Sequence, residues 1–103
     1  MKKSDRKSII SAVKRVIIKI GSSVLTDKKG SLSESVFDVL AEEISGIKAR
    51  GIEVVIVSSG AIASGMKKLN LSVKPSEISM KQAIAACGQS ALIRNYERAF
   101  SSF

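Results

Sequence analysis

The stretch VIIKIGSS at residues 16–23 has a close counterpart in VVIVSSGA at residues 54–61. Each begins with an apolar run rich in β-branched residues, which predicts a buried strand, and each ends in serine and glycine. In open parallel α/β sheets, ligands bind just outside the carboxyl ends of the strands. The two stretches therefore predict one polar pocket, formed where two neighbouring strands end.

A helix is expected between the two strands, from about residue 33 to residue 50. Apolar residues recur at the helical period from Val36 to Ile47, and Gly51 follows where many helices end. Ser31 and Glu34 have the spacing of a capping box. Strand, helix and strand form a β-α-β unit, which predicts parallel strands and a right-handed crossover.

Two more helices are expected after the second strand. The first runs from about residue 61 to residue 69 and ends at Asn70, and the second opens with a capping box at Ser79 and Gln82 and continues to about Phe100. The predicted order is β-α-β-α-α.

The long last helix is rich in small residues and contains Gly88. A glycine inside a helix costs about 1 kcal/mol relative to alanine, so a close contact with a neighbouring element is expected at Gly88. Cys87 is expected to be a small core residue of the same helix.

Length and composition restrict the function classes. The 103 residues are 45% hydrophobic and 25% charged, which is ordinary for one globular domain. No apolar run approaches the roughly 20 residues of a membrane span, so no membrane association and a cytoplasmic location are expected. Histidine is absent, which removes the commonest metal ligand and general base, and no metal site is predicted.

The net charge of +8 is concentrated at the N-terminus, where residues 1–15 hold +5 of it. Residues 1–14 are predicted to be a basic, frayed arm. Aromatic residues make up only 4% of the chain, so nucleic-acid binding is not expected.

The predicted sheet is too small to stand alone. Its strands are expected to be buried on both faces, and each would have one unpaired edge. The chain is therefore expected to be a fragment, with residues 15–103 forming the opening portion of a larger doubly wound α/β domain.

Lys19 interrupts an otherwise apolar run, where a charge is costly to bury without a role or a partner. Lysine is a compact charge suited to phosphate oxygens, and Gly21 lets backbone N–H groups approach an anion closely. The alternative is a lysine whose stem lies along the sheet while its ammonium reaches solvent. The spacing alone favours neither interpretation.

The second loop, residues 58–61, ends a strand and opens a helix, whose free N–H groups attract a carboxylate or a phosphate. Ser59 as a simple helix cap is the alternative. Capping accounts for one serine but not for the similar loop after the first strand. No G-x-G-x-x-G follows either strand, which disfavours a dinucleotide-dependent oxidoreductase.

Three motifs resemble those of the amino acid kinase family in order and spacing: residues 16–26, residues 56–65 and residues 81–92. Ser22 stands where acetylglutamate kinase and aspartokinase usually carry a second glycine. This serine pair, followed by VLT, resembles the glutamate 5-kinase branch. The resemblance implies a mainly parallel sheet sandwiched by helices, usually assembled as homo-oligomers.

The resemblance also implies an activity: ATP-dependent phosphorylation of the γ-carboxylate of L-glutamate to γ-glutamyl phosphate, the first step of proline biosynthesis, with Mg²⁺ accompanying ATP. By the resemblance, Lys19 is catalytic: it would bind ATP phosphate and stabilise the transferring phosphoryl group. The other implied ligands of ATP phosphate are Gly21, Ser22 and Gly60. The implied ligands of glutamate are Ser59, Gly60 and Ala61.

In the family, the remaining substrate residues and most of the nucleotide pocket lie further along the chain than Phe103. The 103 residues alone are therefore expected to be inactive. Two other classes remain open: a non-catalytic anion- or amino-acid-binding regulatory module of the same fold, and a nucleic-acid-associated protein that acts through its basic arm.

Overall fold

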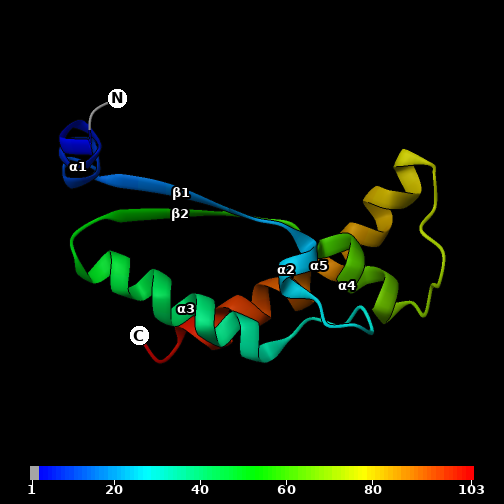
Figure 1. The fold of residues 1–103 in the computed structure, drawn as a ribbon. Helices are drawn as coiled ribbons and strands as arrows, with labels where there is room; N and C mark the ends of the chain where they lie inside the picture. The colour runs from blue at the N-terminus through cyan, green and yellow to red at the C-terminus, as the bar shows by residue number, and fades with distance from the viewer. Residues whose placement is uncertain (1–2) are drawn as a thin grey trace.

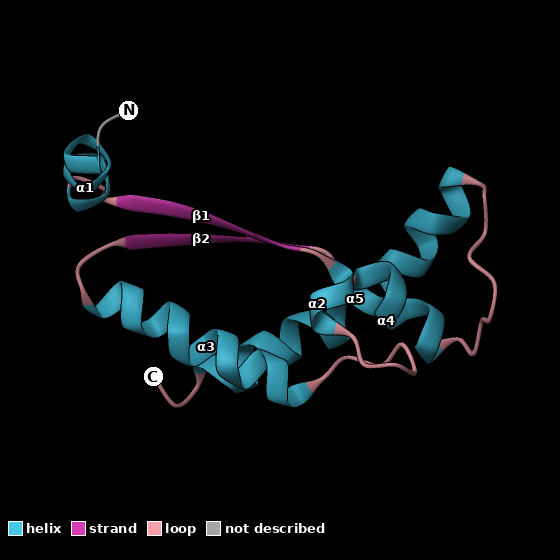
Figure 2. Cartoon of the chain, in the orientation of Figure 1, coloured by secondary structure: helices cyan, strands magenta, loops and turns pink. Residues whose placement is uncertain are grey.

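The computed structural model describes residues 3–103, which form seven helices and strands (Figure 1). In chain order they are α1 (Lys3–Ser11), β1 (Arg15–Ile20), α2 (Ser22–Leu25), α3 (Glu34–Ala49), β2 (Glu53–Ser58), α4 (Ala61–Lys68) and α5 (Ile78–Phe100). The strands are parallel, and α3 and α5 lie along one side of them (Figure 2). The predicted α/β class and β-α-β unit are confirmed.

The register of the sheet runs from the pair Arg15 and Glu53 to the pair Ile20 and Ser58. At the first pair, the Arg15 guanidinium and the Glu53 carboxylate form an ion pair of 2.6 Å. Since side chains alternate along a strand, every second residue of β1 and β2 faces α3 and α5 and is at least half-buried.

The other face of the sheet is open in the part of the chain described. Ile17, Val55 and Val57 on that face are 67%, 44% and 47% exposed. Strands buried on both faces, between two layers of helices, were expected from the apolar runs. Here the structure differs, because helices from residues 3–103 cover one face only.

The N-terminal segment also differs from the expectation of a frayed arm. Residues 3–11 form helix α1, and all side chains from residue 5 to residue 15 are exposed. Residues 1 and 2 of the predicted arm lie outside the described residues. Figure 1 shows α1 at the opposite end of the strands from α2 and α4.

The helix ends agree with the sequence in part. Gly51 and Asn70 adopt positive φ angles of 82° and 55°, as expected for residues that follow a helix. Both predicted capping boxes are wrong: the N-cap residues are Ser33 in α3 and Glu77 in α5, and neither makes a side-chain capping hydrogen bond. Cys87 is exposed and is not a core residue.

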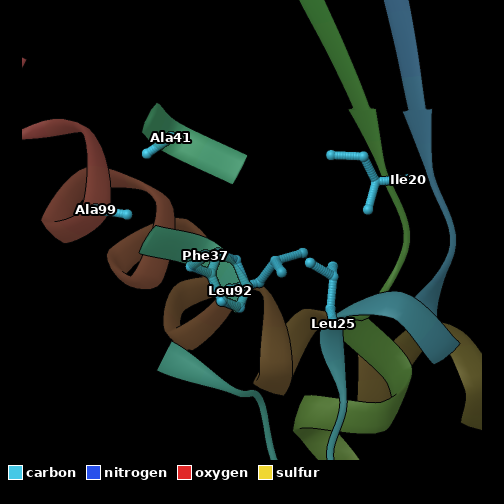
Figure 3. Close-up of a cluster of buried hydrophobic side chains, with 6 residues drawn as sticks. All are labelled: Ile20, Leu25, Phe37, Ala41, Leu92 and Ala99. Carbon is cyan, nitrogen blue, oxygen red and sulfur yellow. The ribbon is translucent and has the colours of Figure 1, made fainter. Parts of the chain in front are cut away.

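The core lies between the sheet and helices α3 and α5 (Figure 3). Its buried members come from β1, α2, α3 and α5: Ile20, Leu25, Phe37, Ala41, Leu92 and Ala99. At its edge, the rings of Phe37 and Tyr96 meet edge-on, with centroids 4.8 Å apart and an interplanar angle of 77°. Because Ile20 and Leu25 flank the first predicted loop, the core directly supports the ends of the strands.

Helices α4 and α5 touch through their backbones at two buried glycines. A Cβ on Gly88 would collide with the carbonyl oxygen of Ala61 and the amide nitrogen of Gly65. A Cβ on Gly65 would collide with the carbonyl oxygen of Ile84. The predicted close contact at Gly88 is confirmed, and α4 is its partner.

Replacing Gly88 by alanine should destabilise the fold, since the added methyl group can be accommodated only if the helix backbones separate. Overpacking of this kind costs about 1–3 kcal/mol, which outweighs the gain in helix propensity. Urea denaturation of Gly88→Ala, followed by circular dichroism, measures the change in the free energy of unfolding.

Gly46→Ala is the matched control. Gly46 lies inside α3, and a Cβ there meets no atom within 4 Å. Alanine at residue 46 should therefore stabilise the chain by up to about 1 kcal/mol. Equal effects of the two substitutions would contradict the backbone contact.

Candidate functional site

The two predicted loops lie side by side at the carboxyl ends of the strands. Ile20 pairs with Ser58 in the sheet register. One residue further, the Ser59 N–H donates to the Ile20 carbonyl oxygen over 2.8 Å. The loop after β2 is thus tied to the end of β1, as expected from the matching strand ends.

A cavity of about 540 Å³ opens beside these loops. Predicted site residues Ser22, Ser59, Gly60 and Ala61 line it together. The remaining lining residues come from the end of β2, from α4, from the following loop and from α5: Ser58, Ile62, Ala63, Met66, Lys74 and Ala85. The structure therefore brings together four of the six predicted site residues.

Gly60 has a backbone conformation that other residues rarely adopt, with φ 114° and ψ −10°. It is buried, and a Cβ there would lie 3.4 Å from the Cδ1 atoms of both Leu25 and Leu92. This turn carries the chain from β2 directly into α4. The positive φ angle of this turn is the reason why a glycine is needed at the N-cap of α4.

The backbone N–H groups of residues 60–63 find no hydrogen-bond acceptor within the described part of the chain. The first N–H groups of any helix lack a partner inside it, and here no side chain caps them. Ser59 does not cap α4, so the alternative interpretation of that serine is wrong. These free donors border the cavity and are suited to an anion.

Lys19 and Gly21 do not line the cavity. Lys19 pairs with Val57 across the sheet, and its side chain lies on the open face. Because only one face of β1 is covered, the Lys19 side chain is exposed and its charge carries no cost of burial. No carboxylate of residues 3–103 forms an ion pair with the Lys19 ammonium.

Sequence reasoning missed Lys74. It lies in the loop between α4 and α5, and that loop brings it to the cavity lining. Lys74 is the one charged residue of the lining. No local pattern marks it, since its position depends on how α4 and α5 pack.

Tyr96 was also missed. Its hydroxyl oxygen lies 2.7 Å from Ser58 Oγ, so it links α5 to the last residue of β2. A lone tyrosine on a long helix carries no sequence signal for such a contact. Its ring sits against Phe37 at the edge of the core.

The donors of the cavity suit an anion. Backbone N–H groups, serine hydroxyls and the Lys74 ammonium can all bind carboxylate or phosphate oxygens, and no carboxylate lines the cavity to repel them. Residues 3–103 hold no group of three or more His, Cys, Asp or Glu side chains that could bind a metal ion. None of their helices is both long and apolar enough to cross a membrane.

Comparison with known proteins identifies relatives of this chain. The model of the amino acid kinase family matches residues 14–103. The chain is 49% identical over 98 residues to a glutamate 5-kinase of Geobacter sp. (strain M21), covering 95% of this chain and 26% of that protein. The identity is 46% over 98 residues for a glutamate 5-kinase of Geobacter sulfurreducens, with the same coverage of 95% and 26%.

A glutamate 5-kinase of Caldanaerobacter subterraneus is 43% identical over 89 residues, which cover 86% of this chain and 24% of that protein. The chain thus spans about a quarter of the length of the curated relatives it matches. The resemblance that the three motifs indicated is confirmed over nearly the whole chain. The chain belongs to the amino acid kinase family.

Proposed function

We propose that this chain supplies the acceptor- and phosphate-binding loops of an ATP-dependent glutamate 5-kinase. The reaction transfers the γ-phosphoryl group of ATP to the γ-carboxylate of L-glutamate and forms γ-glutamyl phosphate, the first step of proline biosynthesis. The observation that carries this proposal is the cavity lined by Ser22 and residues 58–61, with free N–H donors and no carboxylate. The names of the relatives supply the substrate.

Ser59, Gly60 and Ala61 are the proposed ligands of glutamate. The Ser59 hydroxyl and the unpaired N–H groups of the following residues can hold the acceptor carboxylate at the start of α4. Gly60 is also a proposed ligand of phosphate, because it lines the same cavity as Ser22 of the first loop, where Gly21 and Ser22 would contact phosphate. The hydrogen bond from the Ser59 N–H to the Ile20 carbonyl keeps the proposed glutamate ligands next to the proposed phosphate ligands.

Lys19 is the proposed catalytic residue. In phosphoryl transfer the protein mainly positions the reactants and stabilises the charge that develops on the moving group. The Lys19 ammonium is exposed and free of ion pairs among residues 3–103, so no carboxylate competes for it. Its flexible stem lets it reach phosphate oxygens beyond the end of β1.

ATP and Mg²⁺ are the proposed cofactors, and the cavity lining fits the phosphates of ATP better than it fits a metal ion. Amide, hydroxyl and ammonium donors fit phosphate oxygens, whereas no carboxylate in the cavity could hold a divalent cation. Mg²⁺ prefers oxygen ligands and is often bound through substrate phosphates. When bound there, it would neutralise part of the phosphate charge, while residues of this chain orient the acceptor.

The proposal also covers the location, the oligomeric state and the binding partners of the protein. A cytoplasmic enzyme that forms homo-oligomers and binds neither membranes nor nucleic acid fits a kinase of small metabolites.

A chimeric enzyme tests the proposed activity. In it, this chain replaces the matching segment of the glutamate 5-kinase from Geobacter sp. (strain M21). We expect glutamate-dependent formation of ADP, and a hydroxamate when hydroxylamine traps the acyl phosphate. The isolated 103 residues should show no turnover, since the segment spans 26% of that enzyme.

A chimera that unfolds cooperatively but lacks glutamate-dependent turnover would overturn the proposal. Glutamate binding without turnover would favour the regulatory module instead. Steeply salt-dependent nucleic-acid binding, lost on deletion of residues 1–15, would favour the nucleic-acid-associated protein.

Lys19→Ala in the chimera should lower kcat by about 100-fold or more, the usual effect of removing one group that stabilises developing charge. The KM for glutamate should change far less, because Lys19 lies outside the cavity lining. Steady-state kinetics with each substrate varied in turn measures both. Lys14→Ala, at the opposite end of β1, is the control and should match the unchanged chimera. Equal effects on kcat and on glutamate binding would contradict the catalytic role.

Lys74→Ala should act on binding instead. Loss of this exposed charge should raise the KM for glutamate about twofold to fivefold, and the difference should shrink in high salt. Lys68→Ala, an exposed lysine at the end of α4, serves as the comparison. If both variants respond alike, Lys74 acts only through the net charge.

A further inference from the structure

A chain of two hydrogen bonds connects α5 with the peptide group between Ser59 and Gly60. The hydroxyl oxygen of Tyr96 lies 2.7 Å from Ser58 Oγ. The same Ser58 hydroxyl donates to the Ser59 carbonyl oxygen over 2.8 Å. Tyr96 therefore reaches the candidate site without lining the cavity itself.

The direction of this chain follows from counting hydrogens. A carbonyl oxygen can only accept, so the single hydrogen of the Ser58 hydroxyl goes to Ser59. The hydroxyl hydrogen of Tyr96 must then supply the bond between the two side chains. Tyr96 donates to Ser58, and Ser58 donates to the Ser59 carbonyl.

Fixing this carbonyl also fixes the next N–H group. The peptide between Ser59 and Gly60 is trans and planar, so its C=O and N–H point in opposite directions. A glycine on one side makes rotation of such a peptide easy, because glycine adopts positive and negative φ almost equally. Without a partner for the carbonyl, the direction of the Gly60 N–H would be poorly defined.

Tyr96 is itself held firmly. Its ring packs edge-on against Phe37, and it follows Gly88 and Leu92 along one face of α5. Gly88 touches the backbone of α4, and Leu92 is buried in the core. The donor of the hydrogen-bond chain is thus on the face of α5 that packs against α4 and the core.

We propose that Tyr96 is a positioning residue: through Ser58 it orients the Ser59–Gly60 peptide so that the Gly60 N–H is presented to the carboxylate of the acceptor substrate. The Gly60 N–H has no acceptor within the described residues, which leaves it available for that role. The identity of the acceptor rests on the proposed function, but the hydrogen-bond chain does not.

Tyr96→Phe in the chimera tests the kinetic consequence, because phenylalanine keeps the ring against Phe37 and removes only the hydroxyl. The KM for glutamate should rise about threefold to tenfold, as for the loss of one net hydrogen bond. The KM for ATP and kcat should stay within about twofold. If Tyr96 had a purely structural role, the substitution would reduce the active fraction and therefore kcat. It would not raise the KM for glutamate alone.

Substitutions of Ser58 provide the second variant. Ser58→Ala should raise the KM for glutamate at least as much as Tyr96→Phe does. The double variant should raise it no further than Ser58→Ala alone, because the two substitutions break the same hydrogen-bond chain. Ser58→Thr, which keeps the hydroxyl, should recover most of the increase in KM that Ser58→Ala causes. Asn95→Ala is the control on α5, since among residues 3–103 the Asn95 amide bonds only to the Ala91 carbonyl of its own helix. Additive effects, or an unchanged KM in Tyr96→Phe, would overturn the proposal.

An NMR measurement on the 103-residue chain separates this inference from the kinase activity. Tyr96→Phe and Ser58→Ala should shift the Gly60 amide resonance in the same direction, while Asn95→Ala leaves it in place. An unmoved Gly60 resonance would refute the positioning role even if the chimera is active. A shifted resonance in an inactive chimera would retain the positioning role and reject only the proposed acceptor.

Discussion

The parallel register of β1 and β2 is the constraint on which the candidate site depends. Its ladder continues one step beyond the strands, where the Ser59 N–H bonds to the Ile20 carbonyl. A slip by one residue would turn the apolar side chains that face α3 and α5 toward the open side. The same slip would break the tie between the two loops. Burial of one face of the sheet therefore also fixes which loop residues meet.

Helix α5 supports this arrangement by three different kinds of contact along one face. Gly88 allows backbone contact with α4, Leu92 packs in the core beneath Gly60, and Tyr96 bonds to the end of β2. The spacing of four residues places all three on the side that faces the sheet and α4. The helix thus fixes both the start of α4 and the strand that leads into it.

The strands, the crossover and the two serine- and glycine-rich loops could be predicted because short-range periodicity and turn chemistry determine them. The open face around Lys19 could not, since exposure depends on what else covers the sheet and not on the apolar run itself. The capping boxes failed because their spacing does not decide which residue ends the preceding loop. Lys74 and Tyr96 reach the site only through the packing of α4 and α5, which no local pattern encodes.

In the candidate site, the groups that orient a ligand are different from the groups that carry positive charge, and this division suits the proposed reaction. Around Ser59 and Gly60 the donors are neutral backbone groups, fixed by the strand register and by the hydrogen bonds from α5. The positive charges lie at the ends of two flexible side chains: Lys19, on the open face of β1, and Lys74, in the loop between α4 and α5. Fixed neutral donors can hold an acceptor in one orientation. The flexible Lys19 ammonium can follow a phosphoryl group as its charge moves from donor to acceptor.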